Sequence, residues 1–301
     1  MNNEGDKMIN EIIRNIRLNR GMTQSEIAVK VSLTQGTYSK FEAGTIELRF
    51  SAVIDILRNL NVSVSELDSL YNNKRKEINK NETDQILENF FSVIFFDESD
   101  LKKHLTTFDR LIREKNESNL LLNYLDKTLS HIDQLMNKEI MTSSLKEDSL
   151  WEDFFLLKNL FYYEILMLKY IEISSDKTVA LEINKMINQN KKNYESLVCW
   201  NEKFIITLIN VAFIYSFKGQ YHKAIKELLL AEEIIRKKKM YKFLGDCKIR
   251  RGIAMMQSCG NGYDLEQSII LIDSGLNFLE YTQQHYSADM YIHYLKSFVY
   301  V

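Results

Sequence analysis

The chain has 301 residues, of which 45% are hydrophobic and 27% are charged, and its net charge is −2. This length predicts about two domains, the apolar share excludes global disorder, and the near-neutral charge excludes a protein that is basic throughout. Neither a signal-peptide pattern nor a run of about 18 uncharged apolar residues is present, so we expect a cytoplasmic protein that does not engage a membrane.

The residue types that carry most enzyme chemistry are sparse and scattered. The cysteines Cys199, Cys247 and Cys259 form no CxxC pair, and the five histidines lack metal-ligand spacing. No glycine-rich phosphate loop and no GxSxG motif occur. We therefore expect reduced thiols, no cofactor, no metal and no enzymatic activity.

Turn-forming residues are unusually rare. The chain has no proline, and no glycine occurs between Gly44 and Gly219. Sheet proteins use both residues to turn between strands. The sequence therefore predicts an all-α fold whose turns use Asn, Asp and Ser.

The first seventy residues predict five short helices. Residues 7–20 are amphipathic. Thr23 and Glu26 have the spacing of a capping box at the start of a second helix. A third helix is expected to begin after Thr34 and to end at Gly44, which suits a left-handed turn.

Two further helix starts follow, at Ser51 and at Ser63, which has capping-box spacing to Glu66. On the third helix, Tyr38 and Phe41 are expected to face inward. Its outward positions are expected to be Gln35, Gly36, Thr37, Ser39 and Lys40. Helices two and three, joined by a tight turn, predict a helix-turn-helix domain.

The stretches "TQSEIA" and "TQGTYSKFEAG" resemble the Xre type of helix-turn-helix, over about residues 8–70. The resemblance implies that double-stranded DNA is a partner. Gln24 would bind a phosphate, and Arg49 would reach the minor groove. The groove-facing residues would be Gln35, Gly36, Thr37, Ser39 and Lys40, because Gln can bond adenine, Thr can contact thymine and Lys can reach guanine or a phosphate. It also implies a structural ion pair between Arg17 and Glu42.

The charge of this region leaves a simpler alternative open, in which the third helix is an ordinary solvated helix. Residues 1–70 hold eight Lys and Arg against nine Asp and Glu. DNA-binding domains usually carry a basic excess. We interpret the modest charge as a sign of modest affinity per subunit, and expect a dimer on two half-sites of an operator.

Beyond the first domain, expected over residues 1–70, the segment 71–85 predicts a linker because Tyr71 and Ile78 are its only apolar residues. Residues 86–301 predict a second domain of helices in series. Helices are expected over residues 86–96, 101–113, 118–136, 149–172, 177–192 and 199–217.

One segment, Asn210 to Ile235, resembles a tetratricopeptide repeat, with Gly219 at its turn and small alanines between its two helices. A degenerate copy is expected from Cys247 to Phe278, with a turn at Gly260–Gly262. The second domain is therefore predicted to be an α-solenoid of helical hairpins.

An Xre-type domain followed by degenerate repeats resembles the peptide-responsive Rgg/PlcR group of transcription regulators. "FYYEILML" at 161–168 and "DLEQSIILIDSGLNFLEY" at 264–281 are similar to the Rgg/MutR branch. The resemblance implies a homodimer and a short signalling peptide bound on the inner face of the solenoid.

The side chains suited to such a peptide are amides and cations for its backbone and aromatics for its apolar groups. Candidates are Tyr162, Tyr163, Lys203, Asn210, Arg250 and Arg251. Each one could equally be a core tyrosine or a solvated cation.

Two other functions remain open from sequence. One is a constitutive or protein-controlled repressor whose helical domain only dimerises. The other is a repeat protein that modulates a partner enzyme without binding DNA. The first predicts salt-dependent DNA binding and the second predicts none.

Overall fold

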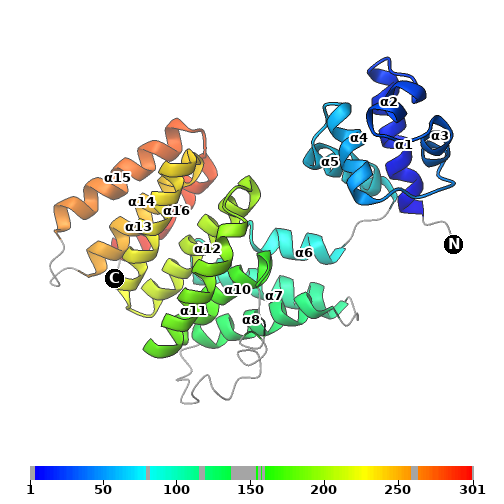
Figure 1. Ribbon diagram of the computed structural model, residues 1–301. Coiled ribbons are helices and arrows are strands. Elements are labelled where there is room, and N and C mark those ends of the chain that lie inside the picture. The colour runs from blue at the N-terminus through cyan, green and yellow to red at the C-terminus, as the bar shows by residue number, and fades with distance from the viewer. Residues whose placement is uncertain are drawn as a thin grey trace. The chain divides into compact units, whose positions relative to one another are not determined.

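The computed structural model describes residues 4–78, 82–114, 119–136, 154, 157, 160–258 and 264–299. Over these residues the chain contains helices and no strand, as the sequence predicts. It divides into two compact units, Met1–Glu82 and Thr83–Val301 (Figure 1).

The first unit is a bundle of five helices around a small apolar core. Its buried residues include Ile13, Ile27, Tyr38, Phe41 and Ile56. The helices are α1 (Glu4–Asn19), α2 (Gln24–Lys30), α3 (Gln35–Glu42), α4 (Phe50–Asn59) and α5 (Val64–Ile78).

The caps expected from sequence are present. The Thr23 hydroxyl accepts from the Glu26 amide at 3.2 Å, and the Glu26 carboxylate accepts from the Thr23 amide at 2.6 Å. The Thr34 hydroxyl accepts from the Thr37 amide at 3.1 Å at the start of α3. Gly44 has a φ of 69°, which places it in the left-handed region that favours glycine. These contacts fix where α2 and α3 begin and where α3 ends.

The second unit is a series of helices with one large core and a smaller one near the C-terminus. Its longer helices are α6 (Glu82–Phe90), α7 (Glu98–Glu114), α8 (Leu120–Met136), α10 (Tyr162–Ile171), α11 (Lys177–Asn190), α12 (Val198–Phe217), α13 (Tyr221–Lys238), α14 (Leu244–Gln257), α15 (Leu265–Tyr281) and α16 (His285–Val299). Short 3-10 turns lie at Glu172–Ser174, Lys191–Asn193 and Tyr241–Phe243.

The hairpins α10/α11, α12/α13 and α14/α15 give this unit its repeat character, and their first helices pack against one another in turn. We call α10, α12 and α14 the inner row. The α12/α13 hairpin is the tetratricopeptide-like unit expected from sequence. Gly219, with a φ of 70°, ends α12, and Ala224 and Ala231 are buried where α13 packs.

The α14/α15 hairpin is held by a seam of glycines. A Cβ atom on Gly252 would lie 2.6 Å from the Ser268 carbonyl oxygen, and one on Gly275 would lie 2.6 Å from the Ile249 side chain. The two backbones approach this closely only because these positions lack side chains. The expected turn at Gly260–Gly262 lies outside the described residues.

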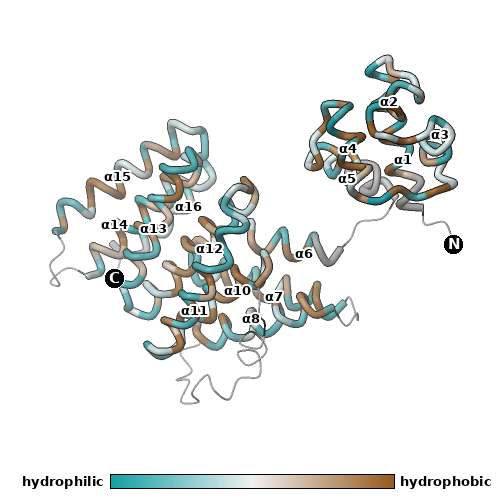
Figure 2. Tube along the Cα trace, in the orientation of Figure 1, coloured by the Kyte–Doolittle hydropathy of each residue, from teal (hydrophilic) through white to brown (hydrophobic). Residues whose placement is uncertain are grey.

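Helix α12 is the most hydrophobic element of the second unit. By length and composition it could cross a membrane, but 83% of its apolar window is buried inside the unit. Hydrophobic residues gather along α10 and α12 (Figure 2). Helix α12 is thus a core helix.

A buried ionic cluster lies between α10 and α13. The Lys169 ammonium is 2.7 Å from the Glu172 carboxylate and 3.0 Å from the Glu227 carboxylate. Asn184 donates a further hydrogen bond to Glu172. Burial lowers the pKa of Lys169, but the two carboxylates outweigh burial and raise it above its ordinary value. Lys169 therefore stays protonated, and the cluster joins the two hairpins.

The helix expected over residues 86–96 is wrong in its second half. Helix α6 ends at Phe90, and residues 93–96 belong to no helix or strand. The physical reason is tertiary, because side chains of α12 and α14 bond the backbone there in place of helical hydrogen bonds.

Two other expected elements differ from the observed ones. Of the helix expected over 149–172, α10 covers Tyr162–Ile171, and much of 149–159 lies outside the described residues. Within the expected linker, α5 continues to Ile78 and α6 begins at Glu82. Sparse apolar residues therefore did not prevent helix formation here.

Candidate functional site

Helix α3 presents polar side chains on one side and is anchored by aromatic rings on the other. Tyr38 is 0% exposed and Phe41 is 3% exposed, so both are fixed in the core. Gln35 and Lys40 are exposed. Gly36 is exposed, and Thr37 and Ser39 are half-buried. The outward positions expected from sequence therefore form one accessible face.

A chain of side-chain contacts connects this face to the core. The Arg17 guanidinium binds the Glu42 carboxylate through two hydrogen bonds, of 2.6 Å and 2.8 Å. The same carboxylate accepts from the Gln24 amide at 2.9 Å. Gln35 then donates to the Gln24 carbonyl at 3.0 Å. The exposed amide of Gln35 is thereby oriented by a buried ion pair.

The electrostatics of the pair suit a fixed structural charge. The hydrogen bond to Glu42 raises the pKa of Arg17. Burial raises the pKa of Glu42, but the hydrogen bonds from Arg17 and Gln24 and the charge of Arg17 together outweigh burial and hold that pKa below its ordinary value. Both groups stay ionised at neutral pH, so Glu42 has no acid–base role.

Arg49 and its neighbour lie at the start of α4. Arg49 is the N-cap residue of α4, is exposed, and makes no side-chain capping bond. Phe50 is 72% exposed beside it. Sequence reasoning did not single out Phe50, because an apolar residue at a helix start usually indicates core.

Two of the expected peptide contacts, Tyr162 and Tyr163, begin α10. The Tyr162 ring meets the Trp200 ring edge-to-face at 5.2 Å between centroids. Tyr163 stacks on Phe91 at 5.7 Å and donates a hydrogen bond to Glu88 of α6. Both rings are therefore half-buried parts of an aromatic cluster.

Lys203 and Arg251 are each engaged in an ion pair. The Lys203 ammonium lies 2.6 Å from the Glu88 carboxylate. Arg251 lies 2.7 Å from Glu232 of α13. Arg251 thus pairs with α13, the second helix of the α12/α13 hairpin, while Lys203 pairs with α6.

Asn210 and Arg250 are both buried, and both bond the segment after α6. The Asn210 carbonyl accepts from the Phe95 amide at 3.0 Å, and its NH₂ group donates to the Val93 carbonyl at 2.8 Å. Arg250 donates to the Phe95 carbonyl. Of the six candidates, Tyr163, Lys203, Asn210 and Arg250 therefore meet α6 and this segment.

A hollow opens on each side of the segment after α6. The smaller, of about 250 Å³, lies toward Lys203 and Asp246, and the larger, of about 510 Å³, lies toward Phe213 and Gln257. The larger one is also lined by aromatic rings and by the start of α7. Its further lining residues include Asp97, Glu98, Phe217, Tyr221 and Tyr294.

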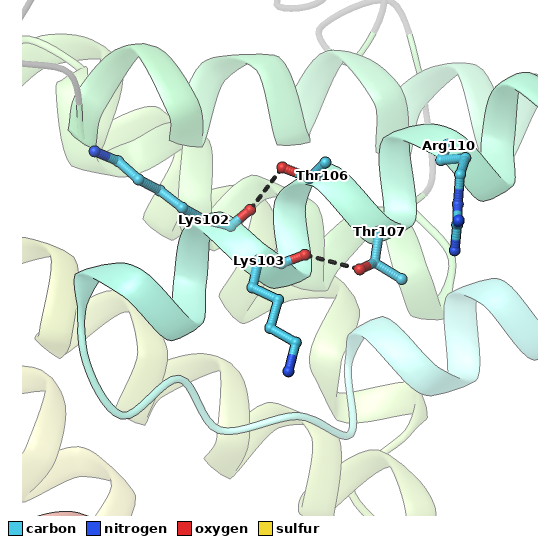
Figure 3. A pocket seen from close by; sticks show the side chains of 5 residues that line it. All are labelled: Lys102, Lys103, Thr106, Thr107 and Arg110. Carbon is cyan, nitrogen blue, oxygen red and sulfur yellow. Dashed lines mark hydrogen bonds between the residues drawn. The ribbon is translucent and has the colours of Figure 1, made fainter.

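A third hollow, of about 380 Å³, lies on α7 and is basic (Figure 3). The hydroxyls of Thr106 and Thr107 donate to the carbonyls of Lys102 and Lys103 on their own helix. The Lys102 ammonium pairs with Glu98 at 2.7 Å. Because these groups already bond to other groups of α7, the residues that line this hollow do not form a ligand-binding site.

Metal ligation finds no support in the part of the chain that the structure describes, where no three His, Cys, Asp or Glu side chains cluster.

Comparison with known proteins agrees with the two-unit organisation. Residues 13–67 match the helix-turn-helix family. A protein of Listeria monocytogenes EGD-e described as a transcriptional regulator has the same fold, with a TM-score of 0.69, 16% identity, and 97% of each chain covered.

Two further solved structures are similar over nearly the full chain. The pheromone receptor Rgg2 of Streptococcus dysgalactiae has a TM-score of 0.59 and 16% identity, covering 96% of this chain and 99% of its own. PlcR of Bacillus thuringiensis, solved with the peptide PapR7 and DNA, has a TM-score of 0.55 and 14% identity, covering 95% of this chain and 99% of its own. No curated protein matches the sequence. The chain therefore has a helix-turn-helix unit followed by the helical fold of these regulators.

Proposed function

We propose that this protein is a transcription regulator that binds an operator through α3 and is controlled by a short peptide bound on the inner row. The observation that carries the DNA-binding part is the linked set Arg17, Glu42, Gln24 and Gln35. It holds an exposed amide in a fixed orientation, on a helix anchored by buried aromatic rings.

The chemistry of α3 suits base recognition. A glutamine amide can bond adenine bidentately, the Thr37 methyl can contact thymine, and Lys40 can reach guanine or a phosphate. Gln24 lies at the N-terminus of α2, where backbone amides favour a phosphate. Arg49 and the exposed Phe50 extend this surface toward the minor groove. Two such units in a homodimer would read two half-sites.

Peptide control is supported by the inner row. Asn210 and Arg250 form hydrogen bonds to the chain's own backbone at Phe95. Aromatic rings lie beside these two residues, and hollows flank them. PlcR was solved with a peptide and with DNA, and Rgg2 is a pheromone receptor. By this reading the regulator acts in the cytoplasm on a peptide taken up from outside.

The DNA-binding part is tested by titrating the purified full chain onto its own upstream DNA at two salt concentrations. Gln35→Ala is expected to weaken specific binding by about 1–3 kcal/mol, or roughly 5- to 150-fold. Lys40→Ala is expected to weaken it and to lower the salt dependence by about one counterion if Lys40 meets a phosphate.

Arg58→Ala is the matched control, because Arg58 lies on α4, is exposed, and pairs only with Asp55 at 3.3 Å among the contacts described. It should leave specific binding within about twofold, since a surface change of this kind is worth under ~0.5 kcal/mol. Unchanged operator affinity in Gln35→Ala and Lys40→Ala, with both variants folded, would contradict the assignment of α3.

The peptide part is tested by repeating the titration with culture supernatant that contains secreted peptides. A change in operator affinity that protease treatment of the supernatant abolishes supports peptide control. Specific DNA binding that no supernatant changes would favour a constitutive or protein-controlled repressor. No DNA binding under any condition would favour a repeat protein that acts on a partner protein.

A further inference from the structure

The segment between α6 and α7 lies against α12 and α14 of the inner row. Residues 93–96 belong to no helix or strand, and side chains bind their backbone. The Asn210 amide binds both the Val93 carbonyl and the Phe95 N–H, and Arg250 binds the Phe95 carbonyl. We call Asn210 and Arg250 the backbone clamp.

The clamp recognises backbone rather than particular side chains. A side-chain amide that accepts from one residue and donates to the residue two positions earlier fits any extended peptide. The same strategy lets extended ligands dock with affinity from the main chain and specificity from side-chain pockets. In this chain, the Phe95 ring is 0% exposed and lies beside the rings of Phe90 and His104.

The clamp is oriented by a further layer of contacts. Arg250 donates from Nε to the Tyr291 hydroxyl at 2.8 Å, and that hydroxyl donates to Asp246 at 3.0 Å. The Arg250 guanidinium also lies 5.3 Å from the centre of the Phe213 ring. These contacts therefore fix the position of the Arg250 guanidinium. They do so whether the carbonyl that it binds belongs to the chain's own segment or to a bound peptide.

A hollow lies on each side of the segment. The hollow on one side is lined by Lys203 and Ile206 of α12, and the hollow on the other side by Phe213 and Phe217 of the same helix. Asn210 lies between these pairs at helical spacing. A peptide longer than the segment could therefore occupy both hollows only by crossing the clamp.

Little of the segment is deeply buried apart from Phe95. Ser92 is exposed, and Val93, Ile94 and Phe96 are half-buried. Release of the segment would fully expose one large ring, that of Phe95. Phe90 and Phe91 would stay in place at the end of α6. The segment is thus a weaker part of the core than the helices it touches.

We propose that the segment Val93–Phe96 is the chain's own occupant of the peptide site, and that the effector is an extended apolar peptide with an aromatic side chain that displaces it from Asn210 and Arg250. This inference rests on the proposed peptide control. It also connects the peptide site to the helix-turn-helix unit along the chain. The segment directly follows α6, and α6 is the first helix after α5 of that unit.

The test uses the full chain and a labelled synthetic peptide of residues 92–97, Ser-Val-Ile-Phe-Phe-Asp. Phe95→Ala weakens the internal occupant and leaves the clamp intact. It is expected to bind the hexapeptide at least tenfold more tightly than the wild type does. Adding Asn210→Ala to Phe95→Ala should abolish this gain. Phe108→Ala is the matched control, since Phe108 is buried in the same core on α7 and its ring lies beside those of Phe90 and His104.

Equal hexapeptide binding by Phe95→Ala and Phe108→Ala would overturn the proposal, because the gain would then reflect a loosened core. So would a gain that survives Asn210→Ala. Helical circular dichroism establishes first that each variant is folded.

A second measurement needs no variant. In wild-type protein, hydrogen exchange at the Phe95 amide is expected to be at least 100-fold faster than at Ile209 in α12, and faster still with excess hexapeptide. Exchange at Phe95 as slow as at Ile209, and unchanged by the hexapeptide, would overturn the proposal. Neither measurement involves DNA or the natural peptide, so a failure of the proposed function remains distinguishable from a failure of the clamp.

Discussion

Arg17 and Glu42 lie 25 positions apart in the chain and form a buried, two-bond ion pair behind the exposed face of α3. Because Glu42 also accepts from Gln24, and Gln24 from Gln35, the pair sets the geometry of side chains that solvent can reach. Stability and recognition are therefore linked in the first unit.

Removing one partner of this pair is expected to destabilise the helix-turn-helix unit strongly. Arg17→Met leaves the Glu42 carboxylate buried without its cation, which typically costs about 3–5 kcal/mol. Urea denaturation of the full chain, followed by a probe in residues 1–82, measures the loss. The double variant Arg17→Met/Glu42→Leu should recover much of it. A single variant as stable as the wild type would show that the ion pair is dispensable.

The same pair predicts how the unit responds to acid. The pKa of Glu42 in the fold lies below its unfolded value of about 4.3, so the unfolded chain binds more protons as the pH falls. The contribution of Glu42 is therefore fully present above about pH 5 and is lost as the pH falls through the folded pKa. Thermal midpoints from pH 7 to pH 3 should fall less in Glu42→Gln than in the wild type. Parallel curves would exclude Glu42 as a source of acid sensitivity.

The glycine seam between α14 and α15 predicts which of two Gly→Ala substitutions in α14 destabilises the second unit more. In Gly252→Ala the new Cβ meets the Ser268 backbone carbonyl, which cannot move without moving α15. In Gly245→Ala it first meets the side chain of Leu279, which can change rotamer. Both should destabilise the second unit by about 1–3 kcal/mol, with Gly252→Ala the worse of the two. Chemical denaturation of the two variants side by side measures the order, and the reverse order would contradict the close-approach argument.

The ionic cluster around Lys169 predicts that the second unit depends on this buried cation. Lys169→Met leaves the Glu172 and Glu227 carboxylates buried and uncompensated, at a cost of about 3–5 kcal/mol. Chemical denaturation of the variant beside the wild type measures the loss, and a variant as stable as the wild type would contradict it.

Local sequence signals predicted much of the first unit. The hydroxyl and carboxylate at Thr23 and Glu26 act over three residues, and so does the Thr34 cap. Such short-range contacts can be read from spacing alone. The hydrogen bond between Gln24 and Gln35 could not, because it depends on how two helices are placed in space.

The segment after α6 shows where sequence reasoning fails. Its apolar residues fit a helix as well as a strand over so short a run, and the structure forms neither. What decides its conformation is Asn210, which lies 115 residues further along the chain and bonds its backbone. The same distance hid the fact that Asn210 and Arg250, expected to bind a peptide, bind the chain's own backbone in this structure.

That separation has a consequence during protein synthesis. Phe95 leaves the ribosome 115 residues before Asn210 and 155 residues before Arg250. At typical elongation rates of ~5–20 residues per second, the wait for Asn210 alone lasts about 6 to 23 s. Throughout that time the nascent chain carries the apolar run "FFSVIFF" with no partner from α12 or α14 to cover it. This run is therefore a site at which a chaperone would protect the nascent chain until α12 and α14 have been made.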